Sequence, residues 1–258
     1  MSATDSGSGA GRSPDGGSTG SGSTPSSSAG RAQRILLATR NAKKLVELRR
    51  IVDAAGLADV EIVGLADVPE FPEAPETGST FAENALAKAR DAAAATGLPA
   101  IADDSGITVD ALNGMPGIFS ARWAGRHGDD EANLQLLLGQ TGDVPDSRRG
   151  AAFVCAAALV TPAGAAADTR DGTAGGARSV GAPLGEVPGQ TVVHGTWRGT
   201  LLRAPRGENG FGYDPIFAPE EGTRSSAELS AEEKDAASHR GRALRALVPH
   251  LQALLTES

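Results

Sequence analysis

Short apolar runs alternate with segments of helical periodicity in the first half of the chain, and this alternation constrains the fold more than any other feature. Residues 34–39 (Arg-Ile-Leu-Leu-Ala-Thr) form an apolar run that stops at polar residues, which predicts a buried strand. Asn41 is then a suitable N-cap for a helix whose apolar residues, from Leu45 to Ala55, recur at helical spacing. Alternating strands and helices are typical of α/β proteins.

The same kind of pattern continues along the chain. Further strands are expected at 60–63, 99–102, 151–160 and 191–197, and the run 107–112 either continues or follows the strand at 99–102. Helices are expected at 80–96, at 129–138 and after Ser230. Thr80 and Ser230 each open a capping-box sequence, which marks a helix start. Ligands in open α/β sheets bind beyond the carboxyl ends of strands, and the polar clusters 39–44 and 103–106 are expected there.

Two segments lack these patterns. Residues 1–33 contain no Val, Ile, Leu or aromatic residue, and Gly or Ser occupies 18 of the first 30 positions. Such a composition buries too little apolar surface to offset the entropy of ordering, so we expect a disordered tail. Residues 161–190 are rich in Ala, Gly, Pro and Asp without a period, which predicts a flexible insertion. The folded domain is therefore expected to span 34–258.

Charge and composition exclude several classes of protein. A net charge of −8 argues against a broad nucleic-acid surface, although local cations can still hold a small polyanion. The chain has no run of 18 apolar residues, so no membrane span is expected, and a cytoplasmic location is the default. The single cysteine, Cys155, lies within an apolar run and is expected to be a buried core thiol.

The segment 39–44 combines a strand end, a turn and a helix start. Lys43 and Lys44 fall in the first helical turn, where the helix dipole disfavours cations. Exposed backbone N–H groups together with two lysines would make a phosphate site. The alternative is a pair of solvated lysines, and the segment lacks the glycine spacing of a Walker A loop.

Asp103 and Asp104 are adjacent carboxylates that come directly after an expected strand. Neighbours in an extended chain point to opposite faces, so one carboxylate can face a cleft while the other faces the interior. A carboxylate beside phosphates is repelled unless a divalent cation such as Mg²⁺ bridges them, and it could also activate a water molecule. The alternative is a plain turn with Ser105 and Gly106. Glu70, Glu73 and Glu76 are candidates for a second oxygen ligand.

Two later segments could hold a nucleotide base. Residues 210–215 place Phe211 and Tyr213 among glycines, and an aromatic ring there could stack on a base while Asp214 accepts hydrogen bonds from ring N–H groups. His239 and Arg240 begin the last helix and could donate to carbonyl or phosphate oxygens. A turn packed by its own aromatics and a structural histidine are the alternatives.

Seven motifs occur in order along residues 34–255. They are Thr39-x-Asn41-x-x-Lys44, Thr80-Phe81-x-Glu83-Asn84-Ala85, Ile101-Ala-Asp-Asp-Ser-Gly106, Gly114-x-Pro-Gly117, Ser120-Ala-Arg122, Gly210-Phe-Gly-Tyr-Asp-Pro215, and Glu233-Lys234 with Ser238-His-Arg240. Together they resemble the inosine triphosphate pyrophosphatase family, which removes deaminated purine nucleotides such as ITP, dITP and XTP. The resemblance implies an α/β fold with a mixed, elongated central sheet flanked by helices, two lobes with the active-site cleft between them, and a homodimer.

The resemblance also implies a reaction and a role for each matched residue. The reaction is Mg²⁺-dependent hydrolysis of a nucleoside triphosphate to the monophosphate and pyrophosphate. Asp104 would bind the metal and accept a proton from the attacking water. The loop 70–76 departs from the family pattern, and within it Glu76, just before Thr77-Gly78, is favoured over Glu70 as the second metal ligand. Our interpretation of the carboxylate pair gives Asp103 a supporting role. The expected substrate-binding residues are Thr39, Arg40, Asn41, Ala42, Lys43, Lys44, Ser105, Phe211, Gly212, Tyr213, Asp214, Lys234, His239 and Arg240.

This chain departs from the family pattern at Arg40, where the family often has glycine. A non-catalytic nucleotide-binding module and a pyrophosphatase for other modified nucleotides remain alternatives. The intact pair Asp103 and Asp104 distinguishes the first, because binding alone does not need it. A substrate panel distinguishes the second.

Overall fold

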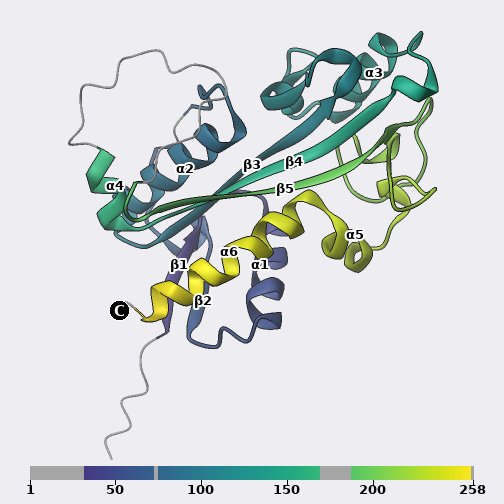
Figure 1. Ribbon diagram of the computed structural model, residues 1–258. Coiled ribbons are helices and arrows are strands. Elements are labelled where there is room, and N and C mark those ends of the chain that lie inside the picture. Colours follow the sequence, from purple (N-terminus) through teal and green to yellow (C-terminus); the bar gives the residue numbers. More distant parts are fainter. Residues whose placement is uncertain (1–31, 73–74, 169–186, 257–258) are drawn as a thin grey trace, which may run out of the picture. The chain divides into compact units, whose positions relative to one another are not determined.

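The computed structural model describes residues 32–72, 75–168 and 187–256. A six-stranded sheet with the order β2-β1-β3-β4-β5-β6 forms its centre (Figure 1). The strands are β1 (Gln33–Leu37), β2 (Val60–Val63), β3 (Ala100–Val109), β4 (Gly150–Val160), β5 (Gln190–Leu201) and β6 (Phe217–Pro219). β1 is parallel to β2 and β3, whereas β3, β4, β5 and β6 pair antiparallel in turn.

The helices begin where local capping signals place them. They are α1 (Ala42–Ala54), α2 (Phe81–Thr96), α3 (Asp130–Gln140), α4 (Pro162–Asp168), α5 (Ala231–Ala237) and α6 (His239–Thr256). Asn41 caps α1 by accepting the N–H of Lys43, and Ser230 forms the expected capping box with Glu233 at the start of α5. The prediction of a mixed α/β sheet flanked by helices is confirmed, and the prediction of two lobes stays a prediction.

The helices cover the two faces of the sheet separately (Figure 1). α1 and α6 pack with the strand residues Ile101, Cys155 and Leu159 on one face. α2 and α4 pack on the other face, where the strands present mainly alanines, including Ala102 and Ala156. Because small side chains allow close approach, an alanine-rich helix packs tightly on this face. Cys155 is buried, as expected.

The course of β3 through the carboxylate pair was left open by the sequence. It predicted a strand over 99–102 that the run 107–112 either continues or follows, with a turn over 103–106 as the alternative to a functional site. The structure has one continuous strand, in which Asp103 pairs with Ala157 and Gly106 with Val154. The continuous strand is therefore confirmed over the turn, because β4 offers an uninterrupted antiparallel partner and its ladder of hydrogen bonds keeps the polar residues extended.

The structure describes only parts of the predicted tail (1–33) and of the predicted insertion (161–190). The tail prediction lies outside the described residues except at Ala32 and Gln33, and Gln33 already belongs to β1. Within the insertion predicted at 161–190, residues Pro162–Asp168 form α4 and Gln190 begins β5. Residues 169–186 lie outside the described part. A helix therefore replaces part of the expected flexible segment.

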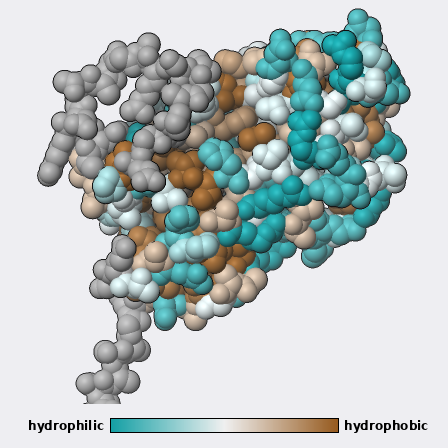
Figure 2. All heavy atoms as spheres, in the orientation of Figure 1, coloured by the Kyte–Doolittle hydropathy of each residue, from teal (hydrophilic) through white to brown (hydrophobic). Residues whose placement is uncertain are grey.

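The surface of the described part exposes few large apolar side chains. They are Val46, Phe119, Leu136 and Phe211. Hydrophilic residues predominate over the end that carries α3 and α5 (Figure 2). None of the helices within the described residues is both long enough and apolar enough to span a membrane.

Candidate active site

Two adjoining hollows lie beside the middle of β3. The first, of about 710 Å³, contains the carboxylates of Glu76, Asp103 and Asp104 and is called the carboxylate hollow here. The second, of about 730 Å³, contains the rings of Phe153 and Tyr213 and is called the aromatic hollow. Both are lined by Ser105, Ala121, Phe211 and Arg240, so these residues form the wall that the hollows share.

Every residue predicted for the site lines at least one hollow. The carboxylate hollow is lined by Thr39, Arg40, Asn41, Lys44, Glu76, Asp104, Ser105, Phe211 and Arg240. The aromatic hollow is lined by Ala42, Lys43, Ser105, Phe211, Gly212, Tyr213, Asp214, Lys234, His239 and Arg240. The segment 39–44 is therefore divided between them, whereas the sequence treated it as one phosphate site.

Asp103 is the buried member of the carboxylate pair. Its Oδ2 atom lies 2.7 Å from Lys44 Nζ and 3.4 Å from Arg240 Nε. Burial alone would raise the pKa of Asp103, but the charges of Lys44 and Arg240 outweigh burial and hold the pKa well below its usual range. Asp103 thus ties a lysine at the start of α1 to an arginine at the start of α6.

The Asp104 side chain points to the opposite face of β3 from Asp103, toward α2. Its Oδ2 accepts a hydrogen bond from Asn84 Nδ2 at 2.9 Å, and its Oδ1 lies 3.6 Å from Lys88 Nζ. Burial raises the pKa of Asp104, and the Lys88 charge and the Asn84 hydrogen bond offset this in part. A carboxylate with a raised pKa is better suited to accept a proton than an ordinary one.

Glu76 reaches the same place from the loop before α2. It forms an ion pair with Lys88 through Oε1, and its Oε2 accepts from Arg122 at 3.1 Å. Although burial raises the pKa of Glu76, Lys88 and Arg122 lower it below its ordinary value. Glu70 is exposed, and Glu73 lies outside the described residues.

The donor set in the carboxylate hollow fits Mg²⁺. Asp104 and Glu76 both converge on the ammonium of Lys88, so two carboxylates already face one position of positive charge. Mg²⁺ commonly binds through one or two carboxylates and keeps several waters or phosphate oxygens as its other ligands. The described residues contain no group of three or more His, Cys, Asp or Glu side chains arranged to hold a metal, so the remaining ligands would be waters and substrate.

The loop around Phe211 is held by Asp214. Asp214 is buried, and its Oδ2 accepts the N–H of Phe211 at 2.9 Å and pairs with Lys234, while its Oδ1 accepts from Ser226. Lys234 also lies 5.5 Å from the centroid of the Phe211 ring. Because both oxygens have protein partners, Asp214 shapes the loop, and a direct bond from Asp214 to a base stays a prediction.

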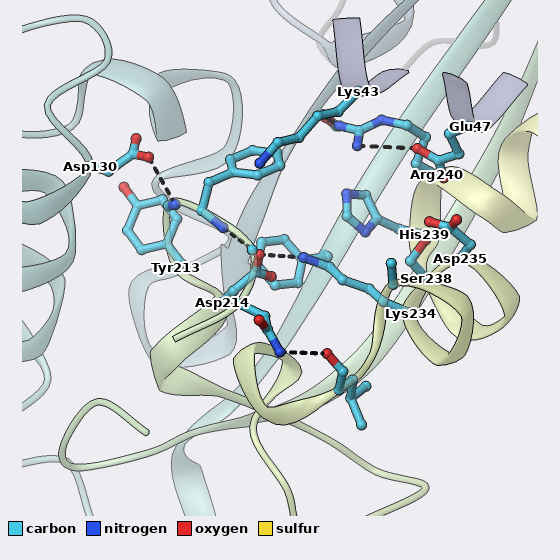
Figure 3. A pocket seen from close by; sticks show the side chains of 18 of the residues that line it. Lys43, Glu47, Asp130, Tyr213, Asp214, Lys234, Asp235, Ser238, His239 and Arg240 are labelled. Atoms are coloured by element: carbon cyan, nitrogen blue, oxygen red, sulfur yellow. Dashed lines mark hydrogen bonds and ion pairs between the residues drawn. The ribbon is translucent and has the colours of Figure 1, made fainter. Parts of the chain in front are cut away.

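His239 and Arg240 close the aromatic hollow from α6. The His239 ring stacks on Phe153 with centroids 5.0 Å apart, and its Nδ1 is buried without a hydrogen-bond partner in the described part. Burial holds the pKa of His239 well below its usual value, so the ring is neutral near pH 7. Arg240 donates to Ser105 Oγ at 3.2 Å and lies 3.7 Å from Glu47 (Figure 3).

Three site residues were given no role on the basis of the sequence. Asn84 and Arg122 stand in the quoted motifs, and Lys88 follows Asn84 by four residues in α2. Residues four apart on a helix lie on one face, so the position of Asn84 could have pointed to Lys88. Nothing in the sequence pairs Arg122 with Glu76, because that contact joins two loops 46 residues apart.

Comparison with known proteins agrees with the seven motifs. The Ham1 family model matches residues 35–250. The chain belongs to the Ham1 family. This membership confirms the family resemblance that the ordered motifs indicated.

Relatives in this family match most of the chain. It is 61% identical to the dITP/XTP pyrophosphatase of Nocardia farcinica, over 86% of this chain and 96% of the relative. It is 54% identical to the dITP/XTP pyrophosphatase of Mycobacterium tuberculosis strain H37Rv, over 86% of this chain and 97% of the relative.

Two solved structures share the fold. One is the nucleoside-triphosphatase / dITP/XTP pyrophosphatase of Mycobacterium abscessus, with 55% identity, a TM-score of 0.64, and coverage of 85% of this chain and all of that one. The other is a HAM1 protein from Coxiella burnetii, with 39% identity, a TM-score of 0.68, and coverage of 88% and 100%.

Proposed function

We propose that this chain hydrolyses the deaminated purine nucleoside triphosphates ITP, dITP and XTP to the monophosphate and pyrophosphate. Such an activity would keep these bases out of DNA and RNA. The observation that carries the proposal is the pair of hollows that meet at Phe211 and Arg240, one with carboxylates and cations and the other with aromatic rings. Relatives named dITP/XTP pyrophosphatase, at 54–61% identity, support the same reaction.

The carboxylate hollow suits the triphosphate. Residues Thr39, Arg40, Asn41 and Lys44 line it at the start of α1, where backbone N–H groups and a lysine attract phosphate. Asp104 and Glu76 would hold Mg²⁺, which neutralises phosphate charge when it is bound. Lys88 and Arg122 add further positive charge beside these carboxylates.

Asp104 is the residue proposed to activate water. It accepts a proton as the water oxygen bonds to the α-phosphorus, while the bond from the α-phosphorus to the bridging oxygen breaks and pyrophosphate leaves. Asn84 orients the Asp104 carboxylate through its 2.9 Å hydrogen bond. Asp103 keeps Lys44 and Arg240 in place and does not itself need to touch the water.

The aromatic hollow suits the base. Phe211 is 48% exposed and offers a face on which a purine can stack. A 6-keto purine presents an acceptor at O6 and a donor at N1, and adenine reverses both. Donors such as Arg240 and Lys234 would lose O6 as their hydrogen-bond acceptor if adenine entered. Mismatches of this kind can favour one base over another by up to about 10⁴-fold in favourable cases.

The family resemblance supports two finer proposals, a homodimer and two lobes around the cleft. A cytoplasmic location is kept as the default, and the net charge of −8 favours a small-molecule nucleotide over a nucleic acid as the substrate. The predicted tail and insertion receive no role in the reaction.

A substrate panel tests the function directly. Steady-state rates with Mg²⁺ would be measured on ITP, dITP, XTP, ATP, GTP and modified pyrimidine triphosphates, with both products identified. We expect pyrophosphate release from the deaminated purines, its loss with excess EDTA, and its recovery when Mg²⁺ is restored. Release of orthophosphate, or equal rates on ATP and GTP, would contradict the proposal. Preference for a pyrimidine would favour the alternative substrate class.

A further inference from the structure

Asp130 lines the aromatic hollow and binds the loop that carries Phe211. It is the first residue of α3, and its Oδ2 accepts the N–H of Gly212 at 3.0 Å although the two residues are 82 positions apart (Figure 3). We propose that Asp130 is a positioning residue, which holds this loop in the conformation in which Phe211 faces the purine. This inference rests on the proposed function, in which Phe211 receives the base.

The loop needs such an anchor because its backbone is intrinsically free. Gly210 and Gly212 flank Phe211 and have φ values of 84° and 61°, a region that glycine enters readily. Other hydrogen bonds also hold this part of the loop, including the N–H of Phe211 to Asp214 Oδ2, the N–H of Asp214 to Phe211 O at 3.3 Å, and the Tyr213 hydroxyl to Ser120 O. In the peptide that follows Phe211, these contacts hold only the carbonyl oxygen, and the N–H of Gly212 is bound by Asp130.

The Asp130 carboxylate supplies the acceptor for that N–H from the start of α3. The N–H of Gly212 belongs to the peptide unit directly after Phe211, so this bond limits rotation of the backbone on the far side of the ring. With Asp214 holding the preceding peptide, the backbone of Phe211 is fixed at both ends. A ring fixed in this way loses less conformational entropy when a base stacks on it.

Helix capping does not account for the position of the Asp130 carboxylate. Asp129 is the N-cap of α3 and accepts the N–H of Ala132 at 3.2 Å. Asn133 ties the same helix to the preceding loop through Ala124 N and Ala121 O. The start of α3 is thus secured by its neighbours, and Asp130 is directed toward the loop.

The first test is independent of substrate. Asp130→Ala is expected to speed hydrogen–deuterium exchange in the loop 206–214 of the free enzyme about three- to tenfold, since the loop loses one bond to a charged but exposed acceptor. Asp130→Asn keeps an acceptor oxygen and should restore most of the protection. Glu131→Ala is the matched control, because Glu131 is also an exposed carboxylate in the first turn of α3. Unchanged exchange in Asp130→Ala would overturn the inference.

The second test follows the consequence for the substrate. Stacking acts on the bound substrate and on the transition state alike, so Asp130→Ala should raise KM for ITP about three- to tenfold and leave kcat within about twofold. Ribose 5-triphosphate has no base, and its KM should not change. In a Phe211→Ala background, Asp130→Ala should add no further effect, because a positioning residue acts through the residue that it positions.

The outcomes separate this inference from the proposed function. If Asp130→Ala raises KM equally for ITP and ribose 5-triphosphate, or acts fully in the Phe211→Ala background, the inference is overturned and the enzyme activity stands. If the wild type hydrolyses none of the deaminated triphosphates, the proposed function fails, and the exchange experiment still decides whether Asp130 holds the loop.

Discussion

At the scale of single residues, the site depends on two adjacent carboxylates with different surroundings. Strand geometry sends Asp103 and Asp104 to opposite faces of β3. Asp103 meets Lys44 and Arg240, which lower its pKa, whereas burial raises the pKa of Asp104 beside Asn84. Asp103 is therefore paired with two cations, whereas Asp104 is better suited to accept a proton.

Substitution of Asp104 by asparagine tests that division. Asp104→Asn keeps the shape but removes the proton acceptor and the charge of one Mg²⁺ ligand, so kcat should fall about 10²- to 10⁴-fold. The Kd for ITP should change by less than about tenfold, because the other residues of both hollows are retained. Rapid-quench turnover and calorimetric titration would measure the two quantities. Asp91→Asn is the matched control, since Asp91 is an exposed carboxylate of α2 that lines the same hollow. Equal and slow turnover of wild type and Asp104→Asn would favour a binding module.

At the scale of elements, the site requires α6 to lie close against β5. A Cβ atom on Gly195 would lie 2.0 Å from the carbonyl oxygen of His239 and 2.6 Å from Ala243 N. Both contacts are to the backbone of α6, so an added methyl group cannot be accommodated by a side-chain rotation. The absence of a side chain at Gly195 therefore sets the position of His239 and Arg240 at the start of α6.

Gly195→Ala is expected to push the first turn of α6 away from the sheet. Unfolding free energy should fall by about 1–3 kcal/mol, as is common for overpacked sites, and KM for ITP should rise because Arg240 moves. Urea denaturation and steady-state kinetics would measure these changes. Gly139→Ala in α3 is the control, because a Cβ there meets nothing within 4 Å, and alanine should stabilise the helix by about 0.5–1 kcal/mol. A fully stable and active Gly195→Ala would show that the packing is looser than described.

At the scale of the whole molecule, His239 links stability to pH. Burial keeps its folded-state pKa well below the ordinary value, which is about 6.5 in an unfolded chain. The unfolded state therefore binds a proton more readily than the folded state. The stability that the neutral His239 ring contributes is fully present above about pH 6.5. As the pH falls toward the folded-state pKa, this contribution is lost, and the free energy of unfolding decreases by up to about 1.4 kcal/mol per pH unit.

The measurement is the free energy of unfolding at pH 7.5, 6.5 and 5.5. His239→Gln is expected to be less stable at pH 7.5 through lost stacking on Phe153, but its stability should fall less between pH 6.5 and 5.5 than that of wild type. His250→Gln is the control, since His250 is an exposed histidine of the same helix. Parallel pH profiles for wild type and His239→Gln would contradict this account.

Elements whose signals are local could be predicted from the sequence. The apolar run of β1, the Asn41 cap of α1 and the capping box at Ser230 were predicted correctly, because each depends on residues a few positions apart. The site residues could also be predicted, because family motifs identify them, and they line the two hollows.

The arrangement of the site residues depends on contacts between segments that are distant in the sequence. The continuity of β3 through Asp103 depends on pairing with β4, some 50 residues later in the chain. Lys43 and Lys44 line different hollows because consecutive residues of a helix are turned by about 100°, and that turn matters only once other elements surround α1. The contacts of Glu76 with Arg122 and of Asp130 with Gly212 join segments that share no local signal, so folding alone brings them together.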